Sequence, residues 1–138
     1  MAQVKIYGCK EQLTPIKRQL SDVIHWCTMQ ALGLPPEKRH HRFFPLEQDD
    51  FIYPADRSAA YTVIEVNMMT GRTVATRKRL VCLLFERIQA ELGIAVQDLE
   101  INIIESPPCN WGFRGLHGDE AKLSYKVRQI EEGMIHYG

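Results

Sequence analysis

Length, composition and charge already limit what this chain can be. Its 138 residues are 45% hydrophobic and 25% charged, which is typical of one folded domain and excludes disorder over most of the length. The 17 basic and 17 acidic residues balance, so charge gives no support for nucleic acid or an anionic membrane as a partner. No apolar run approaches the roughly 20 residues of a membrane span. Four scattered cysteines are too few for a disulfide framework, and we expect a cytoplasmic protein.

The first half of the chain predicts a strand, a helix and a second strand. Residues 4–7 alternate as a short strand, and Thr14 and Pro15 suit the N-cap and first position of a helix. Gly33 ends that helix, and residues 42–46 form the second strand. The expected helix face recurs every three or four residues: Ile16, Leu20, Val23, Cys27 and Ala31.

The second half repeats this order after a loop at residues 47–60. Residues 61–68 alternate as a strand, Thr73 is a candidate N-cap, Gly93 ends a helix and residues 99–104 form a strand. The apolar stripe of this helix is Val81, Leu84, Phe85, Ile88 and Leu92, and we expect Cys27 and Cys82 to be small buried hydrophobes. Residues 119–138 fit either a helix or a strand.

The two halves match at an offset of 60 residues. The matched positions include Val4 with Ile64, Leu20 with Leu80, Ile24 with Leu84, and Gly33 with Gly93. This predicts a duplicated βαβ unit and an α+β fold with a four-stranded mixed sheet and both helices on one face.

We expect one domain over residues 1–138, made of units at about 3–47 and 61–105 and a C-terminal arm at 106–138. The other sheet face needs cover, and oligomerisation would supply it.

Metal and phosphate chemistry find no support in the sequence. His40 and His41 are adjacent, so on a strand they point to opposite faces, and no Cys-x-x-Cys or His-x-x-x-His spacing occurs. There is no Walker sequence and no nucleophile elbow. We therefore expect neither a metal nor a cofactor.

Two segments are candidates for ligand binding. Arg72, between a strand and a helix, is beside the unpaired N–H groups of a helix start, and its guanidinium suits a carboxylate. A surface arginine on a turn is the alternative. Trp111, Phe113 and Arg114 stand among glycines and could wall a small apolar pocket with one anion anchor. The alternative is that the aromatic rings fill the core or a subunit interface.

These segments together resemble the tautomerase superfamily, which includes macrophage migration inhibitory factor and 4-oxalocrotonate tautomerase. The resemblance spans about residues 2–120 and rests on Leu13-Thr14-Pro15, the duplication, Thr70-Gly71-Arg72-Thr73 and Asn110-Trp111-Gly112-Phe113. It is greatest for the branch of malonate semialdehyde decarboxylase.

The resemblance implies a homotrimer with a central barrel and a pocket at each subunit interface. In the family an N-terminal proline acts there as general base or acid, arginines hold a substrate carboxylate and aromatic rings exclude water. Arg72 then matches a carboxylate-binding arginine, and Trp111 and Phe113 match the aromatic wall.

The sequence departs from this pattern at the catalytic position. Ala2 stands at the place of the proline, or Val4 if the first strand is shifted. With Met1 removed, Ala2 would offer a primary amine with a pKa of about 8. Lys5 and Glu37 are other candidate bases.

Two further family residues are missing. A second arginine is replaced within Met68-Met69-Thr70, and the acidic residue of the decarboxylases falls at Lys38. We therefore expect tautomerisation of a 2-keto or enol acid rather than decarboxylation. A noncatalytic trimer that binds a small carboxylate is the second hypothesis, and a ferredoxin-like regulatory or RNA-binding module is the third.

Overall fold

The computed structural model describes residues 2–121, so most of the ambiguous segment 119–138 lies outside the described residues. Its main elements are β1 (Ala2–Cys9), α2 (Lys17–Leu32), β2 (His41–Leu46), β3 (Thr62–Met69), α3 (Val74–Leu92) and β4 (Leu99–Ser106). Smaller elements are α1 (Lys10–Leu13), 3-10 turns at Thr14–Ile16, Gln48–Asp50, Val96–Asp98 and Pro108–Asn110, and the strands β5 (Gly112–Phe113) and β6 (Leu116–His117).

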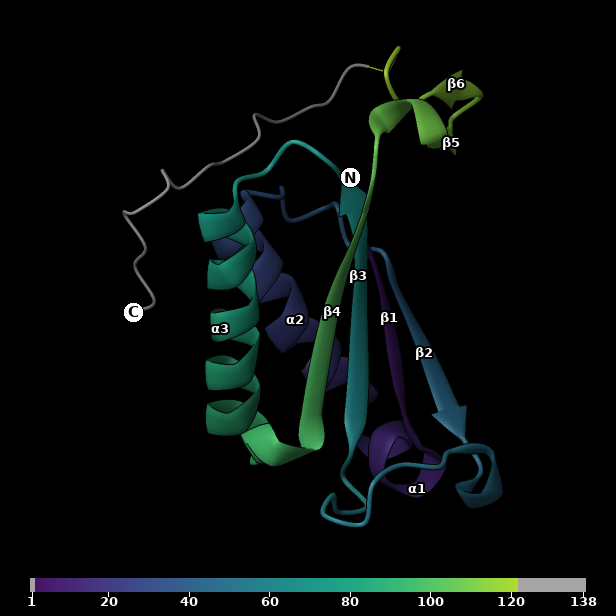
Figure 1. Ribbon diagram of the computed structural model, residues 1–138, viewed down its shortest axis with the longest axis vertical. Helices are drawn as coiled ribbons and strands as arrows, with labels where there is room; N and C mark the ends of the chain where they lie inside the picture. Colours follow the sequence, from purple (N-terminus) through teal and green to yellow (C-terminus); the bar gives the residue numbers. More distant parts are fainter. Residues whose placement is uncertain (1, 122–138) are drawn as a thin grey trace.

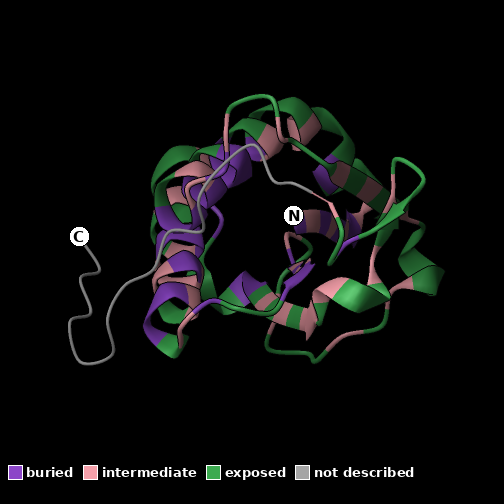
Figure 2. Cartoon of the chain, turned by 90° about the horizontal axis from the view of Figure 1, so that it is seen from above, coloured by how far each residue is buried: buried purple, intermediate pink, exposed green. Residues whose placement is uncertain are grey.

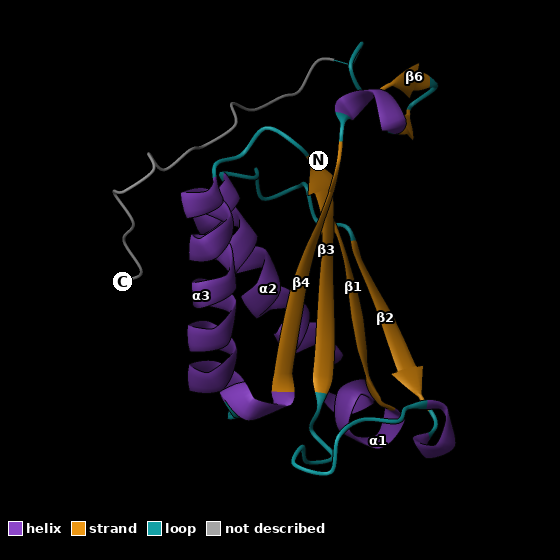
Figure 3. Cartoon of the chain, in the orientation of Figure 1, coloured by secondary structure: helices purple, strands orange, loops and turns teal. Residues whose placement is uncertain are grey.

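The four long strands form a mixed sheet in the order β2-β1-β3-β4 (Figure 1). Strands β1 and β2 are parallel, β3 and β4 are parallel, and β1 and β3 meet antiparallel at the centre. Both long helices cover the same face, as Figure 3 shows. The predicted α+β fold is confirmed. The ferredoxin-like alternative is wrong, because that fold separates the parallel strands of each unit by another strand.

The core lies between the helices and the inner face of the sheet. Alternate residues of β1 and β3 are buried, and Figure 2 shows buried and exposed segments along each helix. Ile6 and Ile64 are opposite each other in the antiparallel pair, and both are fully buried. No helix within residues 2–121 is both long and apolar enough to span a membrane.

The duplication is visible in the way the two helices end. Gly33 and Gly93, 60 residues apart, both have φ of +70°, and each donates its N–H to a carbonyl four residues earlier at 3.0 Å. The left-handed conformation favours glycine because it has no side chain to clash. Leu20 of α2 and Leu80 of α3, also 60 residues apart, are both fully buried.

The start of the first helix differs from the prediction. Helical conformation begins at Lys10, and Thr14 itself has helical dihedral angles, so it is not an N-cap. Pro15 has no N–H to donate to the preceding turn, which accounts for the 3-10 segment that separates α1 from α2.

The predicted apolar stripe of the second helix is partly wrong. Leu80, Leu83, Leu84 and Ile88 are buried, whereas Val81 and Cys82 are only half-buried. One helical position turns a side chain by about 100°, so Val81 and Cys82 face the edge beside β4 instead of the core.

Candidate functional site

The end of the sheet where β1 begins and β3 and β4 finish carries the residues singled out in the sequence. Ala2 is paired with Met68 of β3, and Met69 is paired with Ser106 of β4. Thr70 extends the ladder by donating its N–H to the Ser106 carbonyl at 3.0 Å. The Ala2 side chain is buried, so this end of the sheet is packed rather than frayed.

A tight turn joins this end of the sheet to α3. Gly71 has φ of +124°, a conformation that favours glycine. The Thr73 hydroxyl then accepts a hydrogen bond from the Thr76 N–H at 3.1 Å, which confirms the predicted N-cap.

Arg72 points from this turn toward the end of the other helix. Its side chain is only 8% exposed, and Nη1 donates to the Leu32 carbonyl at 2.8 Å. That carbonyl belongs to the last turn of α2, where a cation is favoured by the helix dipole. The reading of Arg72 as a surface arginine is therefore wrong, and the guanidinium is held between the two helix ends.

An ion pair between Arg77 and Glu105, which the sequence analysis missed, stabilises the turn that carries Arg72. Nη1 of Arg77 lies 3.2 Å from Oε1 of Glu105. The same nitrogen donates a hydrogen bond to the Arg72 carbonyl at 2.8 Å. The other carboxylate oxygen of Glu105 is buried and has no hydrogen-bond partner within residues 2–121. Glu105 and Arg77 lie 28 positions apart on different elements, so neither helix nor strand periodicity signals their contact.

Trp111 packs against the same sheet end through a close approach at Gly118. The Gly118 N–H donates to the Trp111 carbonyl at 2.8 Å. A Cβ at Gly118 would lie 2.9 Å from both Met69 Cε and Trp111 Cβ, and 2.4 Å from the Pro108 carbonyl oxygen. The Trp111 ring nitrogen is buried and lacks a hydrogen-bond partner among the described residues. Ala2, Arg72 and Trp111 are thus all gathered at one end of the sheet.

Phe113 and Arg114 lie on the β5–β6 hairpin. The Arg114 guanidinium stacks over the Phe113 ring at 5.2 Å from its centroid, and Arg114 itself is exposed with φ of +53°. The structure therefore brings a cation and an aromatic ring together here.

The two other candidate bases lie elsewhere. Lys5 is opposite Glu65 and Arg42 on the uncovered face, while the Ala2 side chain faces the helices. Glu37 is exposed in the turn after α2.

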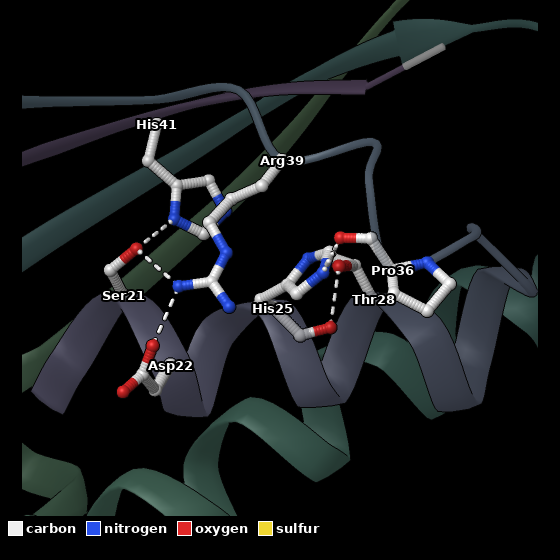
Figure 4. A network of polar contacts seen from close by, with 7 residues as sticks. All are labelled: Ser21, Asp22, His25, Thr28, Pro36, Arg39 and His41. Atoms are coloured by element: carbon white, nitrogen blue, oxygen red, sulfur yellow. Dashed lines mark hydrogen bonds and ion pairs between the residues drawn. The ribbon is translucent and has the colours of Figure 1, made fainter. Parts of the chain in front are cut away.

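A second polar cluster joins α2 to the start of β2 (Figure 4). The Ser21 hydroxyl lies 2.7 Å from His41 Nδ1, and Arg39 donates to the Asp22 carboxylate at 2.6 Å. Burial is the main reason that the pKa of His41 is lowered to about 4, with the positive charge of Arg39 second. Because Asp22 pairs with Arg39 instead of His41, the cluster is not a Ser-His-Asp triad. It links helix α2 to the start of strand β2.

The fold of this chain is shared with a solved structure. The fold is similar to that of the R7 fused 4-OT wild type asymmetric trimer, which is 22% identical, with a TM-score of 0.75. The match covers 85% of this chain and 96% of that one.

The family follows from sequence comparison. A family model described as tautomerase enzyme matches residues 38–114, more than half of the chain, and the chain belongs to this tautomerase family.

Individual relatives agree with this assignment. The probable tautomerase YrdN of Bacillus subtilis (strain 168) is 26% identical over 101 residues, covering 70% of this chain and 78% of the relative. The FG41 malonate semialdehyde decarboxylase, whose structure was solved inhibited by 3-bromopropiolate, is also 26% identical, with a TM-score of 0.72. That match covers 80% of this chain and 88% of the decarboxylase.

Proposed function

We propose that this protein is a homotrimer with a pocket at each subunit interface that binds a small carboxylate, and that it weakly catalyses keto–enol tautomerisation of a 2-keto acid there. Membership of the tautomerase family supports the reaction class, and the trimeric fused 4-OT supports the assembly. The observation that carries the proposal is the placement of Arg72 at the sheet end that also holds Ala2 and Trp111.

Each side chain has a distinct role in this proposal. The Arg72 guanidinium holds the substrate carboxylate, and Arg114 attracts it at the mouth of the pocket. Trp111 and Phe113 exclude water, which strengthens the electrostatic attraction between the guanidinium and the bound carboxylate.

Proton transfer falls to the amine of Ala2 once Met1 is removed. The neutral amine accepts the enol hydroxyl proton and returns a proton to carbon, so the substrate is isomerised without net loss or gain of atoms. An unperturbed α-amino group has a pKa of about 8, so the base form is present near neutral pH.

A noncatalytic carboxylate-binding trimer is the second candidate. It is favoured by the hydrogen bond from Arg72 to Leu32, which gives the arginine a structural reason to be retained whether or not the pocket is catalytic. For either function we propose a cytoplasmic location, consistent with four cysteines that are all free.

The test follows ketonisation of the enol form of a 2-keto acid by the loss of its ultraviolet absorbance. Arg72→Ala is compared with wild type and with Arg87→Ala, which removes a charge from the outer surface, where Arg87 pairs with Glu91 at 2.7 Å. We expect the rate above buffer to fall at least tenfold in Arg72→Ala only. Calorimetric titration with the 2-keto acid is run in parallel, and circular dichroism verifies that each variant is folded.

The outcomes separate the two candidates. Binding without turnover in the wild type supports the noncatalytic trimer. Absence of both binding and turnover, or equal activity in wild type and Arg72→Ala, contradicts the proposed pocket.

A further inference from the structure

Ile52 is the most exposed large hydrophobic residue of the described chain. Its relative exposure is 93%, in the long loop between β2 and β3. A single exposed apolar side chain is common and carries no meaning alone. Ile52 differs from such isolated side chains because the loop that carries it is anchored to the rest of the subunit.

The loop that carries Ile52 is anchored at several points. The rings of Phe51, Tyr53 and Tyr61 have centroids 5.0–5.4 Å apart. The buried Asp98 carboxylate accepts hydrogen bonds from the Ser58 N–H at 2.7 Å and from the Ser58 hydroxyl at 2.6 Å. Ile52 therefore projects into solvent from an anchored loop. Because the loop is already ordered, inserting Ile52 into a partner would cost little conformational entropy.

The charge beside Ile52 is negative. Asp49 and Asp50 are both exposed, and neither takes part in an ion pair with any residue between 2 and 121. The projecting surface thus combines one aliphatic side chain with two carboxylates.

A complementary surface lies at the opposite edge of the sheet. A groove of about 350 Å³ between α3 and β4 is lined by Val74, Arg77, Lys78, Val81, Cys82 and Ile103. Its walls are mainly apolar, and Val74 is 43% exposed. Lys78 is exposed at the border of the groove. Its positive charge is opposite to the negative charge of the loop.

We propose that Ile52 of one subunit inserts into the α3/β4 groove of a second copy of this chain, with Asp49 and Asp50 facing Lys78. This inference rests on the homotrimer proposed above and names one contact between its subunits. The loop segment with Ile52 follows β2, one edge strand of the sheet, and the groove lies beside β4, the other edge strand (Figure 1). Because loop and groove are different surfaces, the contact is head-to-tail and can close into a ring.

The groove itself supplies a chemical test, because Cys82 lines it. Ile52→Cys would bring a thiol against Cys82 of the neighbour, and mild oxidation should join subunits covalently in a non-reducing gel. The double variant Ile52→Cys/Cys82→Ser should show no such link. Val96→Cys is the matched control, because Val96 is also exposed, at 49%, but lies in the turn before β4.

Sedimentation velocity over a dilution series tests the energetics. We expect Ile52→Ser to raise the concentration at which the trimer dissociates at least tenfold, and Val96→Ser to leave it unchanged. Lys78→Glu and the pair Asp49→Lys/Asp50→Lys should each weaken assembly, and combining them should restore it. The side chains substituted in these sedimentation variants are exposed, and circular dichroism verifies that each variant is folded.

The possible failures are distinguishable. A wild-type trimer that Ile52→Ser does not weaken, with no cross-link from Ile52→Cys, overturns the contact and leaves the homotrimer standing. A wild-type monomer at every concentration overturns both. Ketonisation activity is measured separately, so its absence would bear only on the catalytic proposal.

Discussion

Arg72 and Leu32 join the two halves of the duplicated fold. The Arg72 guanidinium, buried at the start of α3, donates to the Leu32 carbonyl at the end of α2 across 2.8 Å. The bond connects residues 40 positions apart and satisfies a carbonyl that the helix itself leaves open. The residue proposed to hold the substrate therefore also stabilises the subunit.

Arg72→Met should lower the free energy of unfolding by about 1.5–3 kcal/mol, the range for a hydrogen bond from a charged donor. Urea unfolding at pH 7 measures the effect. Arg87→Met is the control, because Arg87 is only half-buried, and its i,i+4 pair with Glu91 and its stacking on the Trp26 ring are each worth about 1 kcal/mol or less. Equal losses in the two variants would contradict a structural role for the Leu32 bond.

His41, in the polar cluster between α2 and β2, should make the protein less stable in mild acid. The pKa of His41 is lowered to about 4 in the folded chain, whereas an unfolded histidine has a pKa of about 6.5. Between these values the unfolded state binds more protons, so stability falls as the pH drops. At pH 5 the loss from this group is about 2 kcal/mol.

The measurement compares urea unfolding at pH 7 and pH 5 in wild type and His41→Gln. Removal of the imidazole should make the pH-dependent loss smaller by about 2 kcal/mol. The same pH dependence in both proteins would show that His41 does not titrate as described.

Gly118→Ala should displace the β5–β6 hairpin from the sheet end. The added Cβ would lie 2.4 Å from the Pro108 carbonyl oxygen, which is backbone and cannot rotate away. We expect a cost of about 1–3 kcal/mol, as for other overpacked sites, and a change in Trp111 fluorescence. Gly112→Ala is the matched control, since nothing lies within 4 Å of its Cβ position. Identical spectra and stability for the two variants would refute the close approach.

Ala2→Pro, with Met1 removed, should raise the ketonisation rate at least tenfold. The substitution installs the secondary amine that the resemblance assigns to the family, at the sheet end where Ala2 already lies. Mass spectrometry of the N-terminus verifies the loss of Met1, and a form that retains Met1 serves as control because its residue 2 is an amide. An equally low ketonisation rate in the wild type, in Ala2→Pro without Met1 and in the form that retains Met1 would contradict the proposal that residue 2 provides the catalytic base.

Much of the fold could be predicted because the relevant signals are local. The alternation in β3, the Thr73 cap and the glycine ends of both helices each depend on a few neighbouring residues. The helix start at Lys10 was missed because Thr14 and Pro15 resemble an N-terminus, although the chain is already helical before them.

Much less of the candidate site could be predicted. Sequence spacing singled out Arg72 and Trp111, but it indicated neither the Leu32 carbonyl nor the packing of Gly118 between Met69 and Trp111. The pair of Arg77 and Glu105 was also invisible, because the two residues lie on different elements.

The sequence by itself determined the order of the elements and the duplication, because hydrophobic periodicity and helix-end chemistry act over a few residues at a time. Membership of the tautomerase family also came from the sequence, through the match of residues 38–114 to the family model. Only the tertiary structure decided which side chains meet. Arg72 reaches Leu32, and Ile52 projects away from the core, because sheet register and helix packing set distances between residues far apart in the chain. No local pattern encodes those distances.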